Sequence, residues 1–168
     1  AVRWDAWRLV EGYFAIEDPA RVEVIEREQR LEVELDGVPF VGIVDLVEQR
    51  SGHVVVTDYK TGKPPGERFQ ADRLHQVQLY AAALDAVGMR AERARLLYVR
   101  GRSIDTDVTD SSIGAAVETL QSTWSNIVEA ERSGTFEPTT GPLCAWCPYQ
   151  EHCPEGRAEV ERRYGPSA

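Results

Sequence analysis

The stretch that decides the fold runs from Phe40 to Lys60 and reads FVGIVDLVEQRSGHVVVTDYK. Two apolar runs, Phe40–Val47 and Val54–Thr57, flank the turn signal Arg50-Ser51-Gly52. Runs rich in valine and isoleucine on either side of a short glycine-containing loop are typical of a β-hairpin. The stretch therefore predicts two antiparallel strands at the centre of the chain.

One charged residue lies within the apolar runs of this hairpin, and two more follow its second run. Asp45 lies inside the first run, and Asp58 and Lys60 close the second. Residues two apart on a strand point to the same face, so Asp58 and Lys60 are expected to lie side by side. Because unpaired buried charge is unfavourable, a divalent cation bound by Asp45 and Asp58 is one explanation for this arrangement, and Lys60 is then left to face a phosphate.

Each of these residues also has a purely structural interpretation. Asp45 is then a hydrogen-bonded aspartate of the core or of a strand end, and Asp58 an ordinary strand-end residue. Lys60 is then only the ion-pair partner of Asp58. We favour the metal site, because Asp45, Asp58 and Lys60 are followed along the chain by a further motif, and the order of all these residues is that of a known family.

That order resembles the RecB-type branch of the PD-(D/E)XK nucleases. The resemblance is carried by G-I-V-D-L-V around Asp45, by D-Y-K-T-G from Asp58, and by the Q-x-x-x-Y pair Gln76 and Tyr80. It covers roughly residues 25–155. It implies an α/β fold of the restriction-endonuclease-like kind, a three-layer sandwich with a mixed central sheet and helices on both faces.

The resemblance also implies a role for each site residue. Asp45 and Asp58 would bind Mg²⁺ or Mn²⁺ with help from the backbone carbonyl of Tyr59, since hard oxygen ligands suit these ions. Lys60 would stabilise the attacking hydroxide or the charge that develops at phosphorus. Gln76 and Tyr80 would line the cleft and orient the scissile phosphate, although Tyr80 also suits the core.

Three cysteines, Cys144, Cys147 and Cys153, lie close together near the end of the sequence. Their odd number and close spacing disfavour a disulfide framework. They resemble the clasp of a [4Fe–4S] cluster, whose fourth thiolate would be remote. A zinc site completed by His152 and free thiols are the alternatives, and the three sulfurs are expected to converge on one point.

Two elements of the family pattern are missing. Relatives carry a histidine on an N-terminal helix and a first cluster cysteine near the N-terminus, whereas no histidine precedes His53 and no cysteine precedes Cys144. We therefore expect residues 1–168 to form a single nuclease domain that lacks an N-terminal segment, with a cysteine loop at 135–155. Any cluster in this chain is expected to be absent or incomplete.

Composition limits the remaining possibilities. The chain has 168 residues, 42% of them hydrophobic, with no apolar run as long as a membrane span, which predicts a soluble cytoplasmic domain. The net charge of −9 argues against a simple electrostatic DNA-binding module. Arginines at 90, 93, 95, 100 and 102 form a local basic cluster, which is either a solvated face or a phosphate-binding surface.

The rest of the chain predicts an α-β-β-β-α-β-(β)-α order. Apolar residues at helical spacing indicate helices, and alternating ones indicate strands. The helices are expected at Trp4–Ile16, Arg68–Val87, Asp110–Ala130 and Glu155–Arg163, and the strands outside the hairpin at Val22–Leu35, Ala94–Val99 and Ser103–Val108. The inward stripes are expected to be Leu74, Val77, Tyr80, Ala81 and Leu84 on the second helix, and Ile113, Val117, Leu120, Trp124 and Ile127 on the third.

These features favour a metal-dependent DNA nuclease, more an exonuclease than an endonuclease, with a part in DNA repair or recombination. The alternative is a non-catalytic nuclease-like module that binds DNA or a helicase or other repair partner. An unrelated metal-binding or interaction domain is the third hypothesis.

Overall fold

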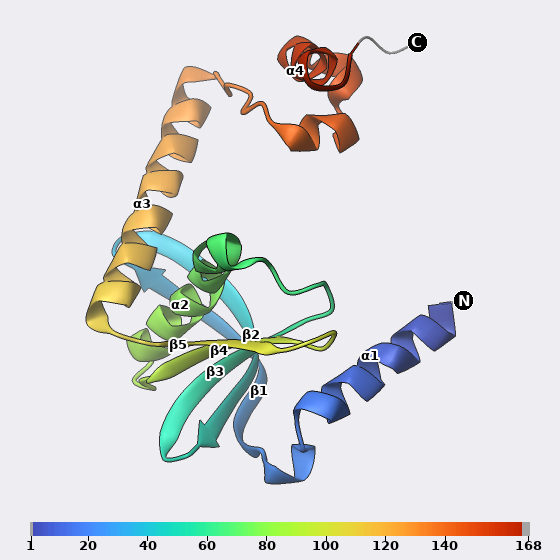
Figure 1. Ribbon diagram of the computed structural model, residues 1–168. Coiled ribbons are helices and arrows are strands. Elements are labelled where there is room, and N and C mark those ends of the chain that lie inside the picture. The colour runs from blue at the N-terminus through green and yellow to red at the C-terminus, as the bar shows by residue number, and fades with distance from the viewer. Residues whose placement is uncertain (1, 166–168) are drawn as a thin grey trace. The chain divides into compact units, whose positions relative to one another are not determined.

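The computed structural model describes residues 2–165 (Figure 1). The chain forms two compact units, one up to Trp124 and the other from Ser125 onward. The first unit holds the sheet and most of the helical core, and the second holds the three cysteines. The expectation of one functional domain over residues 1–168 stays a prediction.

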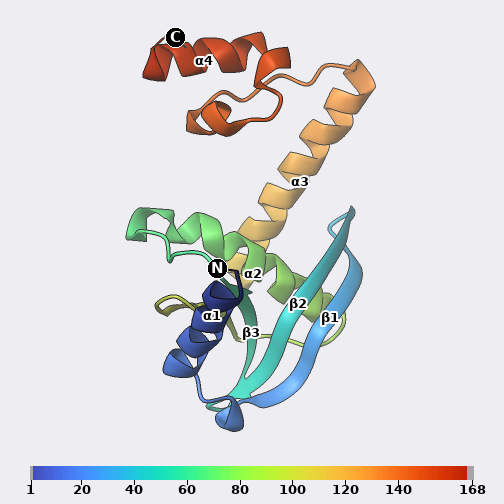
Figure 2. The same ribbon diagram turned by 90° about the vertical axis from the view of Figure 1, so that its right-hand side faces the viewer.

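A five-stranded mixed sheet forms the centre of the first unit. Its strands lie in the order β1 (Glu23–Leu35), β2 (Val38–Arg50), β3 (His53–Lys60), β4 (Arg93–Tyr98) and β5 (Ser103–Asp107). Only β3 and β4 run parallel, and the other neighbours are antiparallel. The β1–β2 hairpin is the longest part of the sheet (Figure 2). The predicted hairpin of β2 and β3 and the mixed α/β sheet are confirmed.

Helix α2 (Gln70–Ala86) connects the parallel strands and covers one face of the sheet. Its inward stripe is as predicted, because Val77, Tyr80, Ala81 and Leu84 are buried and Leu74 is partly buried. These side chains pack in one cluster with Val56 of β3 and Leu96 of β4. The short η2 turn (Glu67–Phe69) leads into α2 and accounts for the earlier start that the sequence predicts.

The opposite face of the sheet contacts helix α1 (Val2–Ile16) and the residues that follow it, including the η1 turn (Pro19–Arg21). Tyr13 packs edge-on against Tyr59, with ring centroids 5.8 Å apart. Since Val56 and Tyr59 have opposite parity on β3, their side chains lie on opposite faces. Helical segments therefore cover both faces of the sheet, which confirms the predicted layering.

Gly12 explains how closely α1 approaches the sheet. A Cβ atom at this position would lie 2.0 Å from the carbonyl oxygen of Val99, just beyond β4. Only glycine allows this approach, so an unfavourable helix residue is retained for packing. The apolar residues that predict α1 are nonetheless mostly exposed, with Trp4 and Phe14 at 72% and 61%.

Helix α3 (Asp110–Ser133) is also confirmed, but its inward stripe is only partly correct. Val117 is buried with Ala116 against Leu79 and Ala82 of α2, and Ile113 and Leu120 are partly buried. Trp124 and Ile127 are 40% and 42% exposed, so their predicted burial is wrong. The apolar residues continue at helical spacing beyond the part of the helix that packs against another element. Periodicity predicts a helix face, but it does not indicate whether another element covers that face.

The second unit contains the end of α3, the turns η3 (Pro142–Trp146) and η4 (Gln150–His152), and helix α4 (Pro154–Tyr164). Helix α4 begins where Pro154 follows Cys153, a favourable first position because proline lacks an N–H group. Glu159 forms ion pairs with Arg162 and Arg163 on the same helix, and these contacts lower its pKa to about 2. Among the described helices, none is both long and apolar enough to cross a membrane.

Candidate active site

The predicted site lies where β2 and β3 stop pairing. Their last paired residues are Leu46 and Thr57, and the next residues along the same register are Asp45 and Asp58. We call the place where the two strands separate the fork. Here the Asp45 side chain replaces the pairing between backbones, because its Oδ2 accepts a hydrogen bond of 2.8 Å from the backbone N–H of Tyr59. The bond ties Asp45 to the residue after Asp58, so the fork holds both aspartates at one place.

Asp58 is a buried carboxylate whose negative charge and hydrogen-bonding capacity are only partly satisfied by its neighbours. Its side chain is 6% exposed, and its Oδ2 lies 2.7 Å from Lys60 Nζ. That contact is an ion pair by distance, but this oxygen makes no hydrogen bond of acceptable geometry. Burial raises the pKa of Asp58, the ion pair with Lys60 opposes the rise, and the nearby charge of Asp45 adds to it. Burial is the largest cause of this raised pKa, so the surroundings of Asp58 disfavour its charged form.

A hydrogen-bonded chain continues from Lys60 to helix α2. Lys60 Nζ donates to Gln76 Oε1 at 2.8 Å, and Gln76 Nε2 donates to the Tyr80 hydroxyl at 2.7 Å. Gln76 and Tyr80 lie four residues apart on one helix face, which places both within reach of the strand end. The structure therefore brings the predicted D-x-K and Q-x-x-x-Y residues together. Tyr80 is also 9% exposed and part of the core, so its place in the core is confirmed and its role at the phosphate stays a prediction.

Gly42 makes room for Tyr80. A Cβ atom at Gly42 would lie 2.9 Å from Tyr80 Cε1, closer than Cβ atoms are found in proteins. The glycine of the G-I-V-D segment therefore lets the tyrosine ring pack against β2. This contact explains in physical terms why a strand interior carries a residue that weakens strands.

The donor set fits a hard divalent cation. Two carboxylates, Asp45 and Asp58, meet one ammonium group at the fork, which leaves an excess negative charge and a buried oxygen without a hydrogen bond. The backbone carbonyl of Tyr59 is the third oxygen that the resemblance implies. Within residues 2–165 no group of three histidine, cysteine, aspartate or glutamate side chains is arranged to hold a metal ion. Protein carboxylates would therefore supply two of the ligands, as is common for Mg²⁺.

Two upstream carboxylates do not join this site. Glu26 and Glu28 are exposed on β1, and no described group of three metal-ligand side chains includes them. Glu28 also has a positive φ of 49° near the irregular pairing between Val24 and Glu26.

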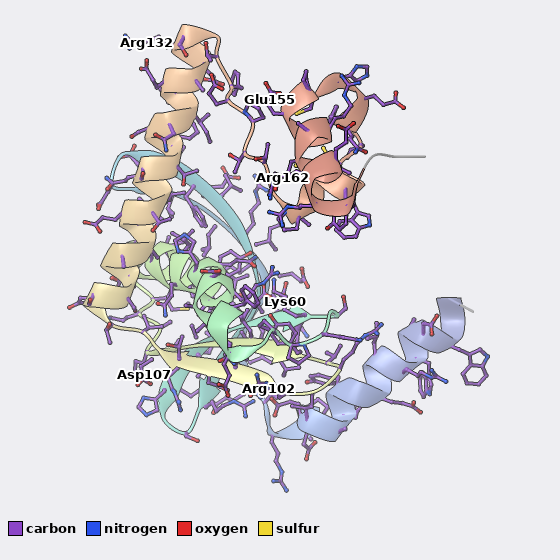
Figure 3. The ribbon with its side chains drawn as sticks, turned by 45° about the horizontal axis from the view of Figure 1, so that its top comes forward. Lys60, Arg102, Asp107, Arg132, Glu155 and Arg162 are labelled. Atoms are coloured by element: carbon purple, nitrogen blue, oxygen red, sulfur yellow. The ribbon has the colours of Figure 1, made fainter. Side chains whose placement is uncertain are left out.

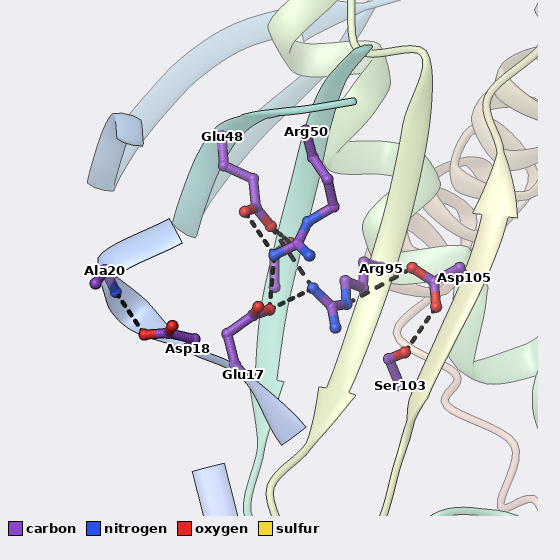
Figure 4. A network of polar contacts seen from close by, with 9 residues as sticks. Glu17, Asp18, Ala20, Glu48, Arg50, Arg95, Ser103 and Asp105 are labelled. Carbon is purple, nitrogen blue, oxygen red and sulfur yellow. Dashed lines mark hydrogen bonds and ion pairs between the residues drawn. The ribbon is translucent and has the colours of Figure 1, made fainter. Parts of the chain in front are cut away.

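A second polar cluster, which the sequence did not predict, lies on the other face of β3 (Figure 4). We call Glu17, Glu48, Arg50 and Arg95 the buried ion network. Glu17 Oε2 lies 2.6 Å from Arg50 Nη2 and 2.7 Å from Arg95 Nη1. Glu48 is 1% exposed, lies 3.0 Å from Arg50, and accepts a hydrogen bond of 3.0 Å from the Thr57 hydroxyl.

The five arginines of the predicted basic cluster do not form one surface, because three of them have ion-pair partners among the described side chains and two do not. Arg95 is buried within the network, Arg93 pairs with Asp107 at 3.5 Å, and Arg90 pairs with Asp85 and Asp110. Arg100 and Arg102, by contrast, form no ion pair with any described side chain. The sequence signal that could have separated them is that Arg95 stands inside the apolar run ARLLYV, where a charge needs a partner.

The cysteines lie in the second unit, and the structure brings the sulfurs of Cys144 and Cys153 near one point. Cys144 accepts a hydrogen bond from Gly141 N and Cys153 one from Gly156 N, and both sulfurs lie within 4 Å of a Cβ built on Gly156. Cys147 is exposed, and the described residues contain no three-ligand group. Two of the three sulfurs therefore lie near one point, no described three-ligand group adds Cys147 to them, and the convergence of all three thiols stays a prediction. The [4Fe–4S] cluster is not supported.

Known proteins place this arrangement in a class. A family model described as the PD-(D/E)XK nuclease superfamily matches residues 5–154, which include the whole sheet, the fork and the three cysteines. The chain belongs to this superfamily. Its members generally use Mg²⁺ or Mn²⁺, which agrees with the oxygen donors at the fork.

Individual relatives are more distant. The chain is 28% identical to the Gene 69 protein of Mycobacterium phage L5 over 131 residues, which cover 73% of this chain and 42% of that protein. It is also 28% identical to the Gene 69 protein of Mycobacterium phage D29, with coverage of 89% and 54%. The chain thus spans about half the length of the curated relatives it matches.

The fold has a counterpart among solved structures. The crystal structure of SSO0001 matches 92% of this chain and 70% of its own, with a TM-score of 0.50 and 17% identity. At that identity the match supports the fold alone.

Proposed function

We propose that this chain is a metal-dependent DNA nuclease of the RecB type, in which Asp45, Asp58 and Lys60 carry the hydrolysis of phosphodiester bonds. The observation that supports this most strongly is the fork, where two carboxylates meet a single ammonium group. Structural charge clusters are usually neutralised within the protein, and this one is not. The missing positive charge is the charge that a divalent cation brings.

The residues at the fork have different roles in this reaction. Asp45 and Asp58 hold the cation, which when bound activates water and neutralises charge on the phosphate. Lys60, held between Asp58 and Gln76, presents its ammonium group to the negative charge that grows on the phosphate oxygens. Tyr80 fixes Gln76 through its hydroxyl group, so Gln76 acts on Lys60 from a constant position.

The narrower assignments rest on the resemblance. The Q-x-x-x-Y pair beside the D-x-K lysine supports the RecB type, and this type suggests an exonuclease that acts on DNA ends during repair or recombination in the cytoplasm. Such a domain acts alone or beside a helicase. No iron–sulfur cluster takes part in this proposal.

A cleavage and metal-binding experiment tests the reaction. Single- and double-stranded DNA labelled at either end, together with closed circular DNA, is incubated with the protein and Mg²⁺ or Mn²⁺. We expect Lys60→Ala to lower the cleavage rate roughly 10²–10³-fold and to keep Mn²⁺ binding in calorimetry, since a cation is not a metal ligand. Asp58→Ala is expected to remove both. Arg27→Ala, at an exposed position on β1, is the matched control and should change neither.

The closed circle separates the two modes of cleavage. An exonuclease releases short products from the labelled ends and leaves the circle intact. Wild-type protein that binds DNA and Mn²⁺ but cuts none of these substrates would replace the enzyme with the second candidate, a non-catalytic nuclease-like module. The small number of acidic ligands at the fork is the observation that keeps this second candidate in view.

A further inference from the structure

Tyr59 connects the fork to the opposite face of the sheet. Its backbone N–H donates the hydrogen bond of 2.8 Å that Asp45 Oδ2 accepts. It stands between Asp58 and Lys60, and Lys60, which is labelled in Figure 3, closes β3. The position of this short backbone segment therefore decides where the two aspartates of the fork lie relative to each other.

The backbone around Tyr59 is paired with a neighbouring strand on one side. Toward β4, the carbonyl oxygen of Lys60 accepts a hydrogen bond of 3.1 Å from the backbone N–H of Val99. Toward β2, strand pairing ends at Thr57, and the N–H of Tyr59 is bonded to the Asp45 side chain instead. A strand end that is paired on one side opens more easily than a strand inside a sheet, so further contacts are needed to hold it.

The side chain of Tyr59 supplies such a contact on the other face of the sheet. Adjacent strand residues face opposite ways, so its ring lies away from Asp58 and Lys60. Tyr13 of α1 packs edge-on against this ring, with centroids 5.8 Å apart and an angle of 81° between the ring planes. This arrangement is favourable, because the positive edge of one ring meets the negative face of the other.

The packing of α1 holds Tyr13 in its place. Tyr13 follows Gly12, where a Cβ atom would lie 2.0 Å from the carbonyl oxygen of Val99. Tyr13 also packs edge-on against Phe14, with centroids 5.5 Å apart. The rings of Tyr13 and Tyr59 are both half-buried, so their contact is partly shielded from water. Helix α1 therefore presents Tyr13 to the sheet at a fixed distance.

The surroundings of the Tyr59 ring favour its neutral form. Burial raises the pKa of Tyr59, the neighbouring Tyr13 raises it further, and the charges of Glu48 and Glu17 add to the rise. The ring thus lies near the buried ion network, on the face away from the fork. A tyrosine in this environment is suited to packing and not to proton transfer.

We infer that Tyr13 is a positioning residue of the fork: by holding the ring of Tyr59, it keeps the Tyr59 N–H on the carboxylate of Asp45. This inference rests on the proposed function, since it gives the position of Asp45 a part in metal binding. Tyr13 lies on the far face of the sheet, so it acts through Tyr59 and not on the substrate.

A positioning role and a purely stabilising role have different consequences. If Tyr13 only stabilises the fold, its loss increases the opening of the whole sheet, and all amides of β3 and β4 are affected alike. If Tyr13 positions Tyr59, its loss frees the end of β3 in molecules that are otherwise folded. The hydrogen bond between Tyr59 and Asp45 then breaks more often than bonds elsewhere in the sheet.

Amide hydrogen exchange in EDTA, followed by NMR, tests this difference without metal or DNA. We expect Tyr13→Leu to speed the exchange of the Tyr59 N–H roughly five- to tenfold, as the loss of an aromatic pair allows. The N–H of Glu92, which donates to the carbonyl oxygen of Val54 at the other end of β3, is the internal reference. The ratio of the two rates removes any change in global stability.

Matched variants show which part of Tyr13 matters. Tyr13→Phe keeps the ring and should keep the wild-type ratio. Trp4→Leu removes an aromatic ring from the same helix at a position that is 72% exposed, and should also leave the ratio unchanged. Asp45→Ala removes the acceptor and gives the ratio for a bond that is lost altogether. If Tyr13→Leu does not fold, Tyr59→Leu removes the same ring contact from the strand and is measured in its place.

Calorimetry with Mn²⁺ gives a second readout that a purely stabilising role would not change. Tyr13→Leu should weaken the Mn²⁺ affinity of the folded protein by the same rough five- to tenfold factor. Cleavage should recover at saturating Mn²⁺, so the metal concentration for half-maximal activity rises while kcat stays near that of the wild-type protein. Tyr13→Phe and Trp4→Leu should bind Mn²⁺ as the wild-type protein does.

The outcomes separate this inference from the proposed reaction. Equal acceleration at Tyr59 and Glu92 in Tyr13→Leu would overturn the inference and leave Tyr13 a packing residue. A Tyr13→Phe variant that behaves like Tyr13→Leu would also overturn it, because the ring would then not be what holds Tyr59. If the ratio rises as expected but the wild-type protein cuts no DNA, the positioning of Asp45 stands and the reaction does not. If DNA is cut and the ratio is unchanged, the reaction stands and the positioning does not.

Discussion

Two polar clusters lie on opposite faces of the same strands, and they differ in how their charge is balanced. The buried ion network sets two buried carboxylates, Glu17 and Glu48, against two guanidinium groups, and Arg95 also pairs at 3.6 Å with Asp105, whose side chain is 41% exposed. The fork sets Asp45 and Asp58 against the single ammonium group of Lys60. Thr57 and Asp58 are neighbours on β3, yet their side chains belong to different clusters because adjacent strand residues face opposite ways.

The comparison shows that buried charge alone does not mark a functional site. Glu48 is less exposed than Asp58, but its charge is matched by arginines and by the Thr57 hydroxyl. The buried ion network as a whole holds together β2, β4 and the segment after α1. Asp58 keeps a raised pKa and an oxygen without a hydrogen bond, and the protein tolerates this cost at a position where a cation can bind.

The largest effect on stability is expected from breaking the buried ion network. Arg95→Met leaves Glu17 and Glu48 with one guanidinium group in a buried place, which should lower the free energy of unfolding by about 3–5 kcal/mol. Chemical denaturation measures the loss. Arg93→Met is the control, because the side chain of Arg93 is 49% exposed and its ion pair is worth at most about 1 kcal/mol.

The same variant also sharpens the contrast between the clusters. Cleavage per folded molecule by Arg95→Met should stay near that of the wild-type protein, since no member of the network contacts the fork lysine. A loss of cleavage in fully folded Arg95→Met would show that the two clusters act as one.

The next effect concerns the helix that precedes Glu17. In Gly12→Ala the new methyl group would meet the Val99 carbonyl oxygen at 2.0 Å, so α1 must move. We expect a loss of about 1–3 kcal/mol, as is typical of overpacking. Gly114→Ala in α3 is the control: nothing lies within 4 Å of its Cβ, and helix propensity predicts a gain of about 0.5–1 kcal/mol.

Thermal unfolding of the two variants gives opposite shifts if this packing is correct. Equal gains from both alanines would mean that α1 does not approach Val99 and that Glu17 reaches the network in another way.

At the fork we expect that removing a charge increases the free energy of unfolding, whereas in the buried ion network it lowers that free energy. The raised pKa of Asp58, caused mainly by burial, means that the folded state binds this proton more tightly than the unfolded state does. Stability from this group is therefore present at low pH and is lost as pH rises through the unfolded and then the folded pKa. Asp58→Asn, which removes that ionisation, should stabilise the metal-free protein at neutral pH.

Urea denaturation in EDTA between about pH 4 and pH 8 tests this sign. The advantage of Asp58→Asn should shrink as pH falls, because the wild-type carboxyl group then also becomes neutral. Glu48→Gln serves as the comparison from the network and should be destabilising at neutral pH. Destabilisation by both variants at neutral pH would mean that Lys60 balances Asp58 fully and that the two clusters do not differ.

The smallest effect is expected at the far end of the Lys60 chain. Tyr80→Phe removes the hydroxyl that accepts the hydrogen bond from Gln76 and should cost about 0.5–1.5 kcal/mol. Cleavage should fall only a few-fold, since Tyr80 acts through Gln76. Tyr149→Phe, at a 72% exposed position, is the control and should alter neither quantity. Loss of cleavage as large as that of Lys60→Ala would give Tyr80 a direct role at the phosphate.

The sequence by itself determined the order of helices and strands and the fork. Local periodicity depends on residues close in the chain, and a hairpin places Asp45 opposite Asp58 whenever its turn forms, so neighbours in sequence became neighbours in space. Gln76 and Tyr80 followed because a helix face repeats every four residues.

Only the tertiary structure decided which charges are neutralised and which apolar faces are covered. Arg95 and Glu17 are 78 residues apart, so nothing local pairs them, and the apolar run around Arg95 indicates only that its charge needs some partner. The same limit explains why Trp124 and Ile127 are exposed. Burial and ion pairing depend on what the rest of the chain brings to a position, and residue type and spacing do not contain that information.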